Sequence, residues 1–112
     1  MKKIGALGAG FMLATGMIAS PVFGQDAISD GVVKIGVLTD MSGAYAGNVG
    51  PGSVLATKLA IEEFDGKVLG KPIELVTADH LNKVDIAASR AREWIDRNQV
   101  DVITELGNSA VA

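Results

Sequence analysis

The stretch at residues 33–47 constrains the fold of this 112-residue chain more than any other part of it. Its first half is apolar and rich in β-branched residues, as expected of a strand that is covered on both faces in a parallel sheet. Its second half is a loop of small residues with one aromatic, Tyr45, and a helical pattern follows. A strand followed by a glycine-rich loop and a helix is how an open α/β sheet presents a ligand site at its carboxyl edge.

The first 24 residues have the pattern of a secretory signal peptide. Lys2 and Lys3 provide a positive start, residues 4–19 carry no charge, and a small-residue cleavage pattern follows a proline. We expect cleavage between Gly24 and Gln25. The alternative is a membrane-spanning helix, but the uncharged run is interrupted by glycines and is shorter than the ~20 residues that a span needs.

The chain contains no cysteine, which excludes disulfides, thiolate metal sites and a lipidated cleavage site. Removal of residues 1–24 would leave eight basic against thirteen acidic side chains, which gives no electrostatic reason to bind nucleic acid or an anionic membrane. We therefore predict that residues 25–112 form a soluble, exported domain.

Strand and helix patterns alternate from residue 32 onward, and the chain stops at what reads as the start of another helix. This alternation predicts a parallel α/β sheet with right-handed crossovers. In the doubly wound order, the second strand lies on one side of the first strand and the third lies on the other. The predicted elements are strands at residues 32–39, 73–78 and 100–104, helices at 51–65 and 84–98, and a loop throughout 40–52.

Each predicted helix has an apolar stripe that we expect to face the sheet. Trp94 lies on the apolar stripe of the helix predicted at residues 84–98, so we expect it in the core rather than in contact with a ligand. Asn82 is a candidate cap for the second helix, Gly66 is placed to end the first in a left-handed conformation, and residues 68–69 should fold back onto the sheet edge. The stripes are Leu55, Ala56, Leu59, Ala60 and Phe64, and then Val84, Ala87, Ala88, Ala91, Trp94 and Ile95.

The expected ligand site is the crevice between the first and third strands, where the chain connection changes direction. Loops at residues 41–52 and 106–109 border it. A helix start offers unpaired N–H donors and partial positive charge, which suit a small carboxylate, and Ser109 is placed to act both as cap and as ligand donor. Alternatives remain open: Ser109 or Asn108 only caps its helix, Ser42 belongs to an ordinary turn, and Tyr45 only covers the sheet edge.

Catalytic and cofactor motifs are poorly supported. Residues 47–52 have the wrong spacing for a dinucleotide fingerprint, and no Walker sequence or Gly-x-Ser-x-Gly elbow occurs. His80 is the single histidine, and for Asp79 and His80 a solvated loop with Asp79 fixing the local backbone is favoured over a ligand role. Asp40 could suggest a phospho-acceptor, which the export pattern disfavours. We expect no enzymatic activity, no cofactor and no metal.

Four segments taken together resemble one family over essentially all of residues 32–112. This is the class of extracytoplasmic solute-binding proteins of branched-chain-amino-acid-type ABC transporters, the leucine/isoleucine/valine-binding proteins. Residues 40–43 followed by 50–53 are especially similar to a subgroup that imports varied carboxylates, including aromatic acids. The segments that carry the resemblance are residues 34–43, 50–52, 70–75 and 101–110.

The resemblance implies a type I periplasmic binding protein, a monomer of the periplasm in which two α/β lobes close on a ligand and dock on a membrane permease. Members of the family are several times longer, so we expect this chain to be a fragment, the first βαβαβ part of lobe 1. The alternatives are a ligand-sensing domain of the same fold in a receptor or regulator, and a small exported α/β enzyme. By the resemblance Ser109 binds the ligand carboxylate and residues 42–47 close over the ligand; the candidate contacts are Ser42, Gly43, Tyr45, Asn108, Ser109 and Ala110.

Overall fold

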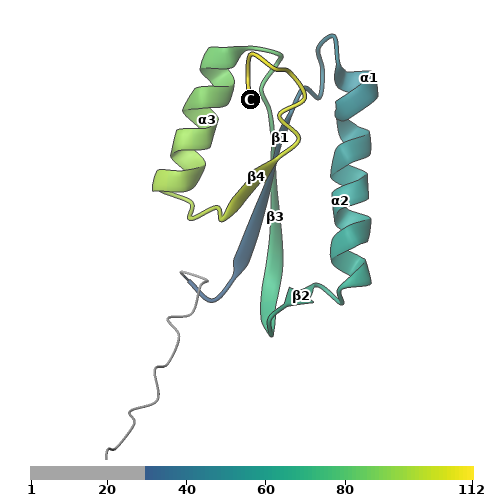
Figure 1. The fold of residues 1–112 in the computed structure, drawn as a ribbon, viewed down its shortest axis with the longest axis vertical. Coiled ribbons are helices and arrows are strands. Elements are labelled where there is room, and N and C mark those ends of the chain that lie inside the picture. Colours follow the sequence, from purple (N-terminus) through teal and green to yellow (C-terminus); the bar gives the residue numbers. More distant parts are fainter. Residues whose placement is uncertain (1–29) are drawn as a thin grey trace, which may run out of the picture.

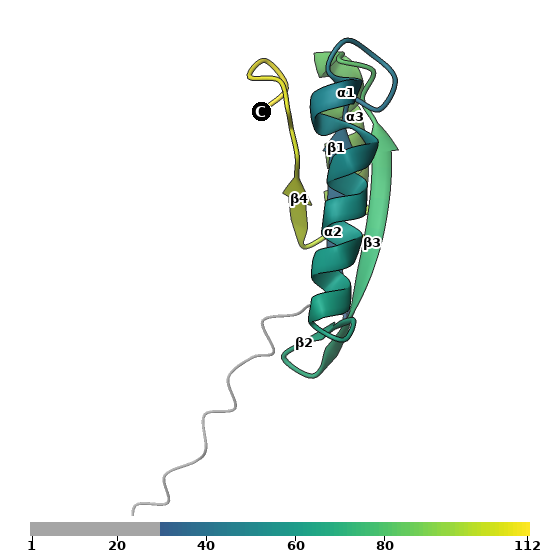
Figure 2. The ribbon, with the colours of Figure 1, turned by 90° about the vertical axis from the view of Figure 1, so that its right-hand side faces the viewer.

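The computed structural model of the chain describes residues 30–112, so the predicted signal peptide and its cleavage site lie outside the described residues. A four-stranded sheet separates the two long helices (Figure 1), and the side view shows one helix on each face (Figure 2). No helix in this described part is both long and apolar enough to cross a bilayer. The elements are β1 (Val33–Thr39), α1 (Ala46–Val49), α2 (Pro51–Glu63), β2 (Lys67–Val68), β3 (Lys71–Asp79), α3 (Val84–Asp96) and β4 (Val102–Thr104).

The strand order β2-β3-β1-β4 confirms the predicted doubly wound parallel topology. β1 is the central strand and runs parallel to β3, with Ile35 opposite Leu75, and to β4, with Ile35 opposite Val102. β2 pairs antiparallel with the start of β3, which places Val68 on the sheet edge as predicted, although Leu69 beside it is 82% exposed. Both long strands lie close to their predicted bounds, β1 within one residue and β3 within two.

Alternate residues of β1 face opposite helices, as the two-residue period of a strand requires. Leu38 is fully buried and packs with Ala87 and Trp94 of α3 and with Val100 before β4. Ile35, on the opposite face, lines an apolar groove with residues of α2. Trp94 is therefore a core residue, as predicted.

The predicted buried face of α2 is wrong. Leu55, Leu59 and Phe64 are 58%, 52% and 64% exposed, and no residue of α2 is fully buried. The helix faces the sheet instead through Val54 and Ile61, which line a hollow with Ile73, Leu75 and Thr77 of β3. Apolar residues occur on more than one side of α2, so periodicity alone does not identify the side that meets the sheet.

The ends of the helices also differ from the predictions. α2 ends at Glu63, because Asp65 and Gly66 adopt positive φ values of 52° and 68°; for Gly66 this is the predicted left-handed conformation. The N-cap of α3 is Lys83 rather than Asn82, and it makes no side-chain capping bond. On the predicted stripe of α3, the two end residues Val84 and Ile95 are 49% and 60% exposed, so the buried part of the stripe is shorter than predicted.

The prediction of loop throughout residues 40–52 is wrong, since α1 forms one helical turn there. The carbonyl of Tyr45 accepts the N–H groups of Asn48 and Val49, and Thr39 Oγ1 donates to the Val49 carbonyl at 2.5 Å. Four residues need only these few bonds, so the glycine at position 47 does not prevent the turn. The bond from Thr39 fastens the end of α1 to the end of β1.

Candidate functional site

The loops that follow β1, β3 and β4 converge at the carboxyl edge of the sheet, the upper end in Figure 1. Three contacts establish the convergence. Ser42 Oγ donates to Asp79 Oδ2 at 2.6 Å, and Asn108 Nδ2 donates to Asn82 Oδ1. The backbone of Gly107 lies directly against Val49, so closely that an added Cβ would meet the Val49 side chain at 2.6 Å. The topology thus brings together the two segments that the sequence predicts as walls of a crevice.

The loop after β1 is built around the carboxylate of Asp40, which is completely buried. Asp40 Oδ1 accepts the Gly43 N–H at 2.6 Å and Oδ2 accepts the Tyr45 N–H at 2.9 Å. A carboxylate that accepts backbone N–H groups makes strong, charge-assisted hydrogen bonds. Asp40 therefore shapes residues 41–45 and has a structural role here.

Asp79 ties the loop after β1 to the loop after β3. Besides Ser42, its carboxylate accepts the N–H groups of Met41 at 3.1 Å and Leu81 at 2.7 Å. Partial burial favours the neutral acid, but the hydrogen bonds from Ser42, Leu81 and Met41 and the nearby His80 outweigh it, so the pKa of Asp79 lies below its usual value. Asp79 fixes the local backbone, as the sequence interpretation favours.

His80 is buried, and the expectation of a solvated loop at this position is wrong. The residue is 1% exposed, and its backbone N–H donates to the Thr39 carbonyl at 2.9 Å, which extends the β1–β3 pairing. Nδ1 accepts the N–H of Asn82 at 3.0 Å. Among the described residues, Nε2 is a buried side-chain polar atom without a partner.

The chain after β4 ends in a single turn that Asn108 organises. The Asn108 carbonyl accepts the N–H groups of Val111 and Ala112, and its Oδ1 accepts the Ala110 N–H at 2.8 Å, as a helix N-cap does. Ser109 stands at the first position of the turn and is exposed. Within residues 30–112 no hydrogen bond occupies either its N–H or its hydroxyl.

The six predicted contact residues thus differ in what they do in the fold. Tyr45 is 44% exposed and Ser109 is exposed, and both present free groups at the sheet edge. The side chain of Ser42 is engaged by the end of β3 and that of Asn108 by the loop after β3. The N–H groups of Gly43 and Ala110 are engaged by Asp40 and by Asn108. Sequence reasoning did not identify Asn82 as a partner of Asn108, since nothing local to either residue signals a contact across 26 positions.

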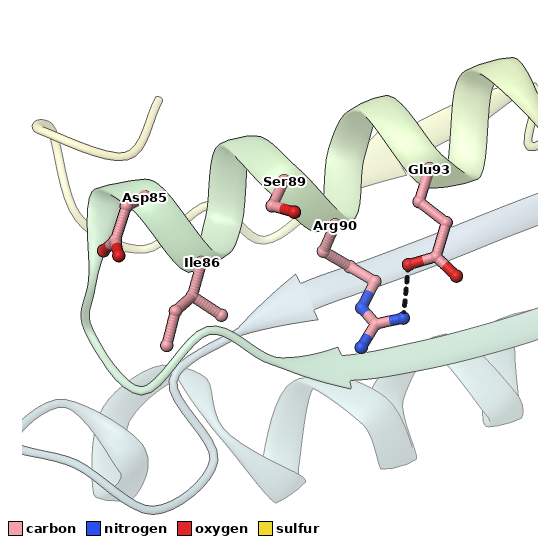
Figure 3. A pocket seen from close by; sticks show the side chains of 5 residues that line it. All are labelled: Asp85, Ile86, Ser89, Arg90 and Glu93. Carbon is pink, nitrogen blue, oxygen red and sulfur yellow. Dashed lines mark hydrogen bonds and ion pairs between the residues drawn. The ribbon is translucent and has the colours of Figure 1, made fainter.

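A separate hollow lies on α3 (Figure 3) and is lined by five residues of that helix alone. Arg90 Nη1 donates to Glu93 Oε2 at 2.7 Å across it, which satisfies both charges. The other three residues are Asp85, Ile86 and Ser89. A shallow surface made by one helix with an internal ion pair offers no converging groups to a ligand.

A doubly wound parallel sheet with free donors on converging loops at its carboxyl edge is the arrangement in which open α/β domains bind ligands. A sequence profile described as "Periplasmic binding protein" matches residues 32–112. The chain belongs to the periplasmic binding protein family, a family of solute-binding proteins and not of enzymes. A search of curated protein sequences finds no match.

Three solved structures illustrate the similarity. A periplasmic binding protein from Burkholderia mallei is 55% identical, with a TM-score of 0.68 over 74% of this chain and 22% of its own. A branched-chain amino acid ABC transporter periplasmic ligand-binding protein from Burkholderia xenovorans is 58% identical, with a TM-score of 0.61 over 63% of this chain and 19% of its own. A solute-binding protein of an ABC transporter from Rhodopseudomonas palustris, in complex with 3,4-dihydroxybenzoic acid, is 31% identical, with a TM-score of 0.61 over 66% of this chain and 20% of its own. The chain spans about a fifth of the length of these structures.

Proposed function

We propose that this chain forms the first part of lobe 1 of a periplasmic solute-binding protein that serves an ABC importer. It binds a small carboxylate, an amino acid or an aromatic or other organic acid, in the cleft at the carboxyl edge of its sheet. The protein acts as an exported, non-lipidated monomer that delivers the solute to a permease in the inner membrane and catalyses no reaction. The family and the ligand classes in the names of its structural neighbours support this proposal.

The observation that carries the proposal is that Ser109 has hydrogen-bond donors without partners. Its N–H and hydroxyl are free within the described chain and exposed, at the start of a turn that Asn108 already caps. An exposed N–H and an exposed hydroxyl without partners can both donate hydrogen bonds to a carboxylate. Because Asn108 makes the capping bond to Ala110, the Ser109 hydroxyl is available for a ligand.

The second wall of the site is the loop of Ser42, Gly43 and Tyr45. The buried Asp40 carboxylate fixes the backbone of Gly43 and Tyr45, and the half-exposed Tyr45 ring offers an apolar surface with a polar tip. In the proposed complex, Asn108, Ser109 and Ala110 hold the carboxylate end, and the loop of Tyr45 covers the rest of the solute. A rigid wall of this kind lowers the entropic cost of binding.

The test is calorimetry of the complete protein with leucine and with 3,4-dihydroxybenzoate as probes. Ser109→Ala should weaken binding of the recognised probe by about 1.5–3 kcal/mol, the range for a hydrogen bond to a charged group, which is roughly ten- to a hundredfold in Kd. Ser109→Thr keeps the hydroxyl and should retain most of the affinity. Ser89→Ala, which removes an exposed serine from α3, is the matched control. Equal affinities for wild type and Ser109→Ala would refute the assignment of Ser109.

A further inference from the structure

Two residues without an assigned ligand contact, His80 and Asn82, connect the core of the sheet with the turn of Ser109. The imidazole of His80 is buried and its Nδ1 accepts the N–H of Asn82 at 3.0 Å. Asn82 Oδ1 in turn accepts Nδ2 of Asn108, and Asn108 Oδ1 accepts the N–H of Ala110 at 2.8 Å. The result is a continuous series of hydrogen bonds from a buried ring to the first turn after β4.

Asn82 holds its place in this series through an unusual backbone conformation. Its φ is +54°, in the left-handed region that asparagine and glycine tolerate best among the amino acids. The neighbouring Leu81 also has a φ of +54°, and its N–H is fastened to Asp79 Oδ1. The bonds to His80 and Asp79 keep both residues in the left-handed region, and this turns the Asn82 side chain toward Asn108.

We propose that Asn82 is a positioning residue for the solute site: anchored by His80, it holds Asn108 and thereby the Asn108–Ala112 turn in the geometry that presents Ser109 to the ligand. The proposal rests on the function proposed above for Ser109. Asn82 itself does not touch the solute. Its amide oxygen holds the Nδ2 group of Asn108, which leaves Asn108 Oδ1 directed to the Ala110 N–H and fixes the orientation of the cap.

Asn82→Gly is the informative substitution because glycine adopts the same left-handed backbone but lacks the side-chain oxygen. It should weaken binding of leucine or 3,4-dihydroxybenzoate to the complete protein by about two- to tenfold, the range for one neutral hydrogen bond. Asn82→Asp retains an oxygen that accepts from Asn108 and should bind within about twofold of wild type. Leu81→Gly makes the same backbone change one position earlier, without contact to the turn, and should bind as wild type does.

Amide hydrogen exchange without any solute separates this proposal from the function proposed for Ser109. In Asn82→Gly the N–H groups of Ala110, Val111 and Ala112 should exchange faster, whereas Leu81→Gly should leave them unchanged. In an Asn108→Ser background, which keeps a capping oxygen but removes the amide, Asn82→Gly should have no further effect on exchange or affinity.

Unchanged exchange at these three N–H groups in Asn82→Gly would overturn the positioning role, whatever the protein binds. Faster exchange with unchanged solute affinity would also overturn it, because the turn would then be held without benefit to binding. Faster exchange in Asn82→Gly, together with a wild-type protein that binds neither probe, would support the structural role of Asn82 and count against the function proposed for Ser109.

Discussion

Gly36 in β1 is the position where one added methyl group should disturb the core most. A Cβ built there would lie 2.5 Å from Cζ3 and 2.7 Å from Cε3 of Trp94, and 3.2 Å from Cγ1 of Val100. Ordinary contacts begin near 3.4 Å, so the indole ring would have to move by most of an ångström. Trp94 is 6% exposed and packs with Leu38 and Ala87, which leaves the ring little space to move.

The net effect of Gly36→Ala follows from two opposed contributions. Overpacking of a well-packed core costs about 1–3 kcal/mol. Replacing glycine by alanine within a strand recovers roughly 0.5–1 kcal/mol of conformational entropy. We therefore expect Gly36→Ala to lower the free energy of unfolding of the complete protein by about 1–2 kcal/mol.

Urea denaturation followed by circular dichroism measures this effect. Gly52→Ala is the control, because a Cβ at that position in α2 meets nothing within 4 Å; alanine should stabilise the helix by up to about 1 kcal/mol. A Gly36→Ala protein that is as stable as wild type, or more stable, would refute the description of Trp94 packed against the bare backbone of β1.

Three further predictions concern the carboxyl edge and the chain as a unit. The folded pKa of Asp79 lies below its ordinary value of 3.8, so its carboxylate should stabilise the protein fully above that pH and lose this contribution as the pH falls through the folded pKa. The difference in unfolding free energy between wild type and Asp79→Asn, measured at pH 7, 5 and 3, should therefore shrink toward pH 3. A constant difference would contradict the assignment. Gly107→Ala should destabilise the contact with Val49 by about 1–3 kcal/mol in denaturation experiments, whereas Gly47→Ala, where an added Cβ meets nothing within 4 Å, should not. The isolated 112-residue chain should be poorly stable and bind little solute, since α2 has no buried residue; cooperative melting together with saturable binding of leucine or 3,4-dihydroxybenzoate would contradict this.

The fold could be predicted because its elements have distinct periods. The near-continuous apolar run of β1 and the spacing of Ala87, Ala91 and Trp94 in α3 each match one kind of element, and the order of elements then determines a parallel sheet. The face of α2 could not be predicted in the same way. Leu55 and Leu59 form as good a stripe as Val54 and Ile61. Packing against β3 determines which of the two faces the sheet, and this packing cannot be deduced from the sequence of α2.

The location of the candidate site could be predicted from the sequence, but its internal contacts could not. Its location follows from topology, which places the loops after β1 and β4 at one edge whatever their sequences. Its internal contacts depend on long-range pairings, such as Ser42 with Asp79 and Asn82 with Asn108, in which a polar side chain has many possible partners. His80 is the clearest case in which local sequence does not predict burial. A histidine in a short polar loop is expected to be solvated, but the pairing of β1 with β3 buries His80.

The most direct test of the proposed function compares each carboxylate with its amide in thermal-shift and calorimetric measurements on the complete protein. Leucine should be compared with leucinamide, and 3,4-dihydroxybenzoate with 3,4-dihydroxybenzamide. At about 100 times its Kd, a carboxylate that the cleft recognises should raise the unfolding free energy by about 2.7 kcal/mol, and its amide should give little or no shift. Equal stabilisation by a carboxylate and its amide, or no binding by any small carboxylate, would contradict a cleft built around the donors of Ser109.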